Sequence, residues 1–195
     1  MRNISKSASW QWGSSLDSLQ IKWCEFTALF LADAIDLLNQ SASTFFYLVK
    51  QMMFNDAMLH LSRLTDPGVQ NGFENLSIRR LSDLISDVGL KQQVVPAVAA
   101  AVTATAFARS WRDKRLAHSD TLSIQGQATV AQPDVEARNV ATGIESVRAV
   151  VSLVAAHYQV FSLSGSSPRP NPWGSQALLY ALQRATIVGH DKRTR

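Results

Sequence analysis

The residues best suited to chemistry lie together in one segment, Arg109 to Asp120. Its sequence, RSWRDKRLAHSD, holds four cations, two acids and a histidine. Histidine exchanges protons near neutral pH, whereas arginine stays charged and binds a phosphate through two N–H groups. An imidazole and a guanidinium are therefore the minimal set for cleaving RNA without a metal ion. Asp113 is a polar neighbour that can orient one of them.

A structural interpretation of the same segment stays open. The segment ends the most apolar helix that the sequence predicts. Lysine or arginine near a helix C-terminus is stabilised by the helix dipole, by about 0.3–1 kcal/mol each. On that interpretation the basic residues form only a charged helix end.

A second polar group interrupts an otherwise apolar helix. Asp56, His60 and Arg63 recur at i, i+4 and i+7, so they share one face. Unpaired burial of such groups is costly, so the stripe must be ion-paired or must face water. One interpretation is an internal network, with Asp56 paired to Arg63 or Asp66 paired to Arg112. The other places His60 and Arg63 in contact with RNA, with Asp66 capping or bridging helices.

Signatures of other enzyme classes are missing from the sequence. The nine glycines never take a phosphate-loop spacing, and there is no G-x-S-x-G elbow. The four histidines and the single cysteine have no metal-ligand spacing. We therefore expect no metal and no cofactor.

Composition bounds the class of protein. A chain of 195 residues fits one globule, and 46% hydrophobic with 17% charged residues excludes a disordered polyelectrolyte. The net charge of +4 permits phosphate partners without demanding them. A lone Cys24 with apolar neighbours predicts a cytoplasmic setting. We expect no secretory signal and no membrane association.

Hydrophobic spacing is helical almost throughout and predicts an all-α fold, an antiparallel bundle of about five to six helices. The expected helices are 16–39, 44–65, 77–88, 90–116, a long helix that Pro133 opens, and 173–187. A loop is expected over 67–74 and a linker over 162–172. In domain terms, we expect a flexible segment over 1–15, a helical domain over 16–187 and a polar tail over 188–195.

Two of these helices have informative faces. The alanine-rich middle of helix 90–116 suits a central core helix or a subunit interface, because small side chains let another helix approach closely. The helix after Pro133 carries a seam with steps of four and three, made of Val140, Ile144, Val147, Val151, Val154, Tyr158 and Phe161. That seam predicts one side of a bundle.

The segment from Arg112 to His118 resembles the R-x(4–6)-H motif of the HEPN superfamily, with Asp113 in the polar position after the arginine. Together with Leu61–Pro67 (LSRLTDP), the segment looks like the AbiU-type abortive-infection branch. The resemblance spans about Trp23 to Ala185. It implies a HEPN-like helical bundle that acts as an endoribonuclease, in most cases a homodimer with two motifs facing one cleft.

The resemblance also implies roles for single residues. Arg112 and His118 take the catalytic positions, and Asp113 departs from the more common asparagine. Arg109, Lys114 and Arg115 are candidates for binding the RNA backbone. In an ideal helix, Arg112 and His118 would lie about 120° apart around the axis and about 9 Å along it. We therefore expect the helix to bend or end near Ala117.

The sequence leaves three functional classes open. The first is an RNA-cleaving toxin or phage-defence effector. The second is a non-catalytic helical module that binds RNA or a protein. The third is half of a toxin–antitoxin pair, in which a nucleotidyltransferase-like antitoxin modifies or masks the site.

Overall fold

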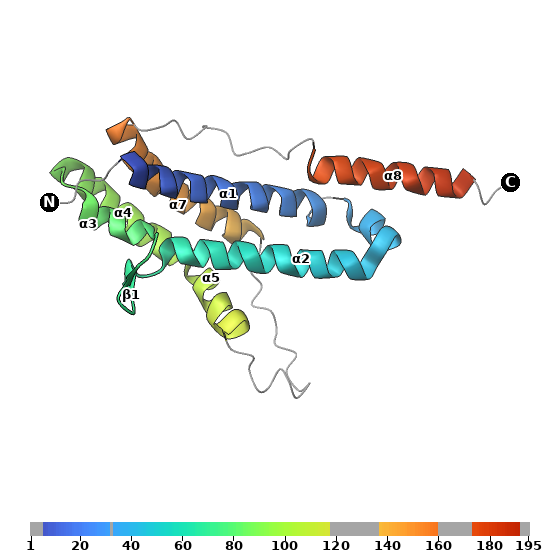
Figure 1. Cartoon of the computed structure of the whole chain (residues 1–195), viewed down its shortest axis with the longest axis horizontal. Helices are drawn as coiled ribbons and strands as arrows, with labels where there is room; N and C mark the ends of the chain where they lie inside the picture. The colour runs from blue at the N-terminus through green and yellow to red at the C-terminus, as the bar shows by residue number, and fades with distance from the viewer. Residues whose placement is uncertain (1–5, 32, 118–136, 160–172, 192–195) are drawn as a thin grey trace. The chain divides into compact units, whose positions relative to one another are not determined.

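The structure is a computed structural model that describes residues 6–31, 33–117, 137–159 and 173–191. The described residues are helical apart from turns and one two-stranded sheet, so the all-α prediction is confirmed (Figure 1). We expected one globule. The described residues instead form two compact units: unit 1 contains 6–19, 58–117 and 137–159, and unit 2 contains 20–31, 33–57 and 173–191.

Helices α1 (Lys6–Phe30) and α2 (Ile35–Thr65) each contribute to both units. Within the segment 1–15 that was predicted to be flexible, residues 6–15 are helical, and Trp12 is buried. The predicted helix 16–39 in fact stops at Phe30, where a turn separates α1 from α2. A non-helical Ala42 lies inside α2, close to the start predicted for the second helix.

Unit 2 is built on an aromatic cluster. Trp23 stacks on Phe26 with 5.0 Å between ring centroids, and Phe54 lies 5.8 Å from Phe26. Cys24 is half-buried beside this cluster, and burial together with the charge of Glu25 raises the pKa of its thiol. The apolar first half of α2 is less buried than the sequence suggests, because several large side chains are exposed: Phe45, Leu48 and Met52.

Helix α8 (Ser175–Asp191) also belongs to unit 2. It extends into the tail predicted for 188–195. Its first turn is tied to α1, because the Ser175 backbone N–H donates to Glu25 Oε2 at 2.6 Å. Gly174 precedes it, and a Cβ at that position would lie 2.5 Å from the same carboxylate. A side chain at 174 would therefore push the capping group away.

Unit 1 is organised by α4 (Val88–Ala104) packing along α7 (Ala137–Tyr158) (Figure 1). The predicted seam of α7 is confirmed from Val140 to Val154, whereas Tyr158 at the end of the helix is only half-buried. Its buried members are Val140, Ile144, Val147, Val151 and Val154. Phe161, Pro133 and the linker 162–172 lie outside the described residues.

Helix α7 is also long and apolar enough to cross a membrane, and α4 with α5 would pass the same test only if counted as one bent span. Length and composition do not distinguish a span from a core helix. The buried seam of α7 faces the interior of unit 1, as in a core helix. The absence of membrane association stays a prediction.

Short elements connect α2 to α4. The loop predicted over 67–74 contains a small antiparallel hairpin, β1 (Val69–Gln70) and β2 (Phe73–Glu74). Asn71 and Gly72 join the strands with φ angles of 51° and 80°, as a tight hairpin turn requires. The predicted helix 77–88 is shorter: a 3₁₀ turn, η1 (Ile78–Arg80), runs into α3 (Leu81–Leu84).

The predicted continuous helix 90–116 is divided into three pieces. After α4, the chain breaks at Thr105 and continues as α5 (Ala106–Trp111) and then η2 (Arg112–Ala117), a π-helical turn. The bend across the break is 43°. This break carries the basic residues away from the direction of α4 and toward the end of α2.

Candidate functional site

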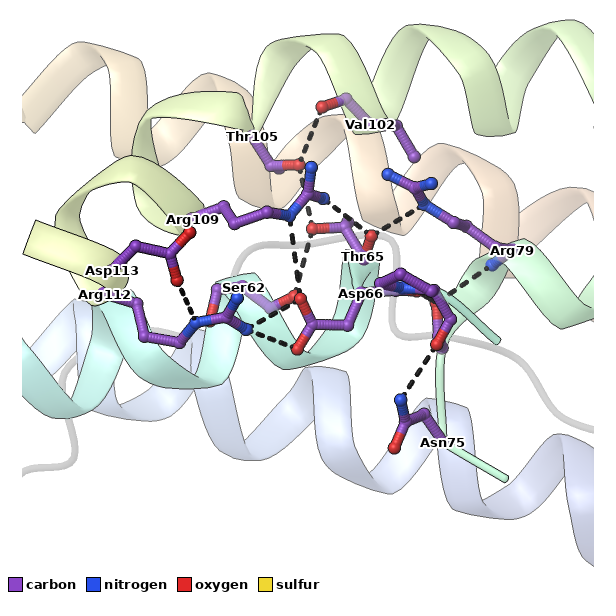
Figure 2. Close-up of polar contacts among 12 residues, drawn as sticks. Ser62, Thr65, Asp66, Asn75, Arg79, Val102, Thr105, Arg109, Arg112 and Asp113 are labelled. Carbon is purple, nitrogen blue, oxygen red and sulfur yellow. Dashed lines mark hydrogen bonds and ion pairs between the residues drawn. The ribbon is translucent and has the colours of Figure 1, made fainter. Parts of the chain in front are cut away.

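The candidate site lies in unit 1 and centres on Asp66, directly after the last residue of α2. Asp66 as a whole residue is only 6% exposed. Both of its carboxylate oxygens accept hydrogen bonds from Arg112 Nη1, at 2.7 and 2.6 Å (Figure 2). The Asp66–Arg112 pair, one of the alternatives for the polar residues of the second helix, is thus present in the structure.

Arg112 is held from a second side by its own neighbour. Its Nε donates to Asp113 Oδ1 at 3.0 Å. Partial burial lowers the pKa of the Arg112 guanidinium, but the hydrogen bonds and charges of Asp66 and Asp113 outweigh burial and leave that pKa above its usual value. Arg112 is therefore a permanently charged group in a defined position, with Nη2 making no hydrogen bond to any described residue.

Two further arginines reach the same turn. Arg109 Nη2 and Arg79 Nε each donate to the Thr65 carbonyl oxygen at 2.8 Å (Figure 2). Arg109 Nε also lies 3.6 Å from Asp66 Oδ1. Arg109 was a candidate for backbone binding, whereas sequence reasoning missed Arg79, which lies 33 positions before Arg112. Nothing in the spacing links Arg79 to the motif, because α3, α4 and α5 intervene.

Ser77 explains how η1 presents Arg79 to this turn. Its hydroxyl donates to the Asp66 backbone carbonyl oxygen and accepts from the Arg79 backbone N–H at 3.2 Å. Serine is a preferred residue at a helix N-cap for this reason. The buried Ser77 thus ties the start of η1 to the end of α2.

The helix break at Thr105 contacts the last residue of α2, next to the site. Thr105 Oγ1 is fully buried and lies 3.0 Å from Thr65 Oγ1 and 2.8 Å from the Ala101 carbonyl oxygen. Helix α7 approaches this contact at Gly143, where an added Cβ would lie 3.2 Å from both Thr105 Cγ2 and Leu61 Cδ2. A glycine on α7 therefore makes room for the hydroxyl pair that joins α2 to the α4–α5 break.

The motif itself is wound as a π-helix from Arg112 to Ala117. Hydrogen bonds from i to i+5 put more residues in each turn than in an α-helix, so the angular offset between Arg112 and Ala117 differs from that of an ideal α-helix. The expected bend occurs earlier, at Thr105. Lys114 is exposed, and His118 and the Arg115 side chain lie outside the described residues.

The polar residues predicted to share one face of α2, Asp56, His60 and Arg63, do not form one hydrogen-bonded network among the described residues. Asp56 pairs with Lys22 at 2.7 Å in unit 2, so the Asp56–Arg63 pair proposed from the sequence is wrong among the described residues. His60 Nε2 lies 2.8 Å from Ser15 Oγ in unit 1. Arg63 is exposed.

Within the described residues, no group of three or more histidine, cysteine, aspartate or glutamate side chains could hold a metal ion. The polar chemistry of unit 1 is concentrated instead in guanidiniums around one carboxylate.

An all-α fold with an R-D-x(4)-H segment after an arginine–aspartate cluster defines the class, a HEPN-type helical domain. A family model described as AbiU2 matches residues 13–169. The chain therefore belongs to the AbiU2 family of HEPN domains, an abortive-infection family. A search of curated proteins and a search of solved structures each return no match.

Proposed function

We propose that this protein is a metal-independent endoribonuclease of the HEPN type, acting as a toxin or phage-defence effector. The observation that carries the proposal is the setting of Arg112. Asp66 and Asp113 hold two of its nitrogens, while Nη2 has no hydrogen bond to any described residue. A guanidinium fixed on one side, six positions before a histidine, is suited to bind a phosphate.

The proposed reaction is transesterification within the RNA strand. His118 takes the proton from a ribose 2′-hydroxyl, whose oxygen then attacks the adjacent phosphorus. The bond from phosphorus to the 5′-oxygen breaks, giving a 2′,3′-cyclic phosphate and a 5′-hydroxyl end. Arg112 stabilises the charge that develops on the phosphoryl oxygens in the transition state.

The leaving 5′-oxygen needs a proton. We propose that the protein works as a homodimer in which the partner subunit's His118, or water, supplies that proton. The site would then be complete only when two copies of the motif face one cleft.

The test compares the parent protein with His118→Ala on structured RNA in excess chelator. Loss of a general acid–base group costs about 10²- to 10⁴-fold in rate, so the variant should give almost no product. His157→Ala is the matched control, because His157 is exposed on α7 and lies outside the site. The parent products should carry cyclic phosphate ends. Equal cleavage by the parent and His118→Ala would refute the assignment.

A second candidate is a non-catalytic module that binds RNA or a protein, including a nucleotidyltransferase-like antitoxin. The favouring observation is again at Arg112, because two carboxylates already accept its hydrogen bonds and an ion pair of this kind also serves a structural role. This candidate predicts retention of RNA by the parent protein with no product even at high protein concentration.

A further inference from the structure

Arg79 and Arg109 form a feature that the proposed chemistry at Arg112 and His118 does not use. Both donate to the same oxygen, the Thr65 carbonyl, each at 2.8 Å. A carbonyl oxygen has two lone pairs and can accept both hydrogen bonds. The shared acceptor holds two like-charged guanidiniums close together, an arrangement that costs free energy unless an anion compensates it.

Of the two carboxylates near these arginines, Asp66 is shared with Arg112 and Asp113 is bound by Arg112. Asp66 accepts from Arg112 Nη1 through both oxygens, and Asp113 accepts from Arg112 Nε. Arg109 Nε is buried without a hydrogen bond to a described residue and lies 3.6 Å from Asp66 Oδ1. Arg79 forms no ion pair with a carboxylate among the described residues. The pair is therefore incompletely neutralised.

Two other observations agree with incomplete neutralisation of Arg79 and Arg109. Burial lowers the pKa of Arg79, the positive charge of Arg109 lowers it further, and Asp66 only partly offsets both effects. Arg79 is half-buried, and its terminal nitrogens make no hydrogen bond to a described residue, because its single contact of that kind uses Nε. Those nitrogens remain available to an incoming oxyanion.

We propose that Arg79 and Arg109 form a second phosphate subsite, which holds a non-scissile phosphodiester of the RNA strand whose scissile phosphate lies at Arg112. The proposal rests on the proposed function in its choice of RNA as the ligand. Asp66 contacts both Arg109 and Arg112, so it fixes the two subsites relative to each other. Guanidinium N–H groups form charge-assisted hydrogen bonds with phosphate oxygens, and this pair places two guanidiniums at one position.

The test measures binding of a fluorescent twelve-nucleotide oligouridylate by anisotropy. All variants carry His118→Ala, so that the RNA stays intact. Arg79→Gln should bind about tenfold more weakly at low salt, and the slope of log K against log salt should fall by about 0.7, the value for one phosphate contact on a single strand. Arg138→Gln is the matched control, because Arg138 is an exposed arginine on α7.

Arg79→Lys keeps the charge and should keep the salt slope of the parent, which separates phosphate binding from a loss of folding. Circular dichroism of each variant checks the fold. If Arg79→Gln binds the oligonucleotide as tightly as Arg138→Gln does, the subsite is refuted.

The two proposals fail separately. RNA cleavage by the parent with unchanged binding by Arg79→Gln would overturn the subsite and leave the nuclease standing. RNA binding that weakens in Arg79→Gln, with no cleavage by the parent, would support the subsite and overturn the nuclease. No RNA binding by the parent would overturn both.

Discussion

Two ion pairs, one on α2 and one directly after its last residue, show how differently the same chemistry behaves in two parts of one chain. In unit 2, Lys22 and Asp56 meet at 2.7 Å with side chains that are 42% and 50% exposed. In unit 1, Asp66 meets Arg112 at 2.6 Å, with side chains 9% and 22% exposed. Water competes with the first pair and screens it, whereas the second is shielded and joined to further hydrogen bonds. Distance alone therefore does not identify the pair that fixes a site.

The largest expected effect on stability comes from breaking the shielded pair. Asp66→Ala leaves Arg112 and Arg109 partly buried without their shared carboxylate. We expect the free energy of unfolding to fall by about 2–3 kcal/mol, measured by urea denaturation. A loss below about 0.5 kcal/mol, which is typical of an exposed ion pair, would show that burial does not strengthen the Asp66–Arg112 pair.

The next largest effect on stability is expected at Gly143, where α7 closely approaches Leu61 and Thr105. Gly143→Val would place methyl groups against Leu61 and Thr105, where even a Cβ would lie at 3.2 Å. Overpacking of this kind costs about 1–3 kcal/mol. Thermal unfolding followed by circular dichroism should show the loss in Gly143→Val and not in Ala141→Val, since Ala141 is exposed on the same helix.

A smaller and local effect is expected in unit 2, where Glu25 accepts from the first turn of α8. Glu25→Ala removes that acceptor, and loss of a helix cap costs about 1 kcal/mol. Amide hydrogen exchange over residues 175–178 should become faster by about fivefold, because only the first turn depends on the carboxylate. Asp36→Ala, at an exposed acid of unit 2, should leave the exchange of α8 unchanged.

The smallest effect completes the comparison. Asp56→Ala breaks the exposed pair with Lys22, and we expect a loss of at most about 0.5 kcal/mol in the same urea measurement used for Asp66→Ala. If Asp56→Ala lowers the free energy of unfolding as much as Asp66→Ala does, solvent exposure does not determine how much each ion pair stabilises the protein.

Much of the fold was accessible from hydrophobic spacing. The seam of α7 follows from a sustained repeat whose members are buried on one face, Val140 through Val154. The break at Thr105 was missed, because threonine and alanine carry no stop signal and tertiary contacts decide where such a helix bends. The hairpin at Asn71–Gly72 does have a sequence signal, an Asn-Gly turn, which the short flanking strands obscured.

The candidate site was predictable only in part. Arg112, Asp113 and Asp66 stood out by residue type, and the Asp66–Arg112 pair was one of two pairings considered. The contact of Arg79 with Thr65 and the hydroxyl pair of Thr65 and Thr105 were not accessible. The hairpin separates the first two positions in the sequence, and the hairpin, η1, α3 and α4 separate the other two. Residue types show which groups can pair, whereas chain topology selects which of them do.

The sequence by itself determined the helical class, the buried seam and the position of the arginine–histidine motif, because periodicity and residue type are local properties. Only the tertiary structure decided that Asp66 is shielded while Asp56 is not, and that Arg79 joins Arg109 at one carbonyl. Burial and electrostatic pairing depend on what the rest of the chain places nearby. That dependence is why two acids on neighbouring stretches of one chain have such different surroundings.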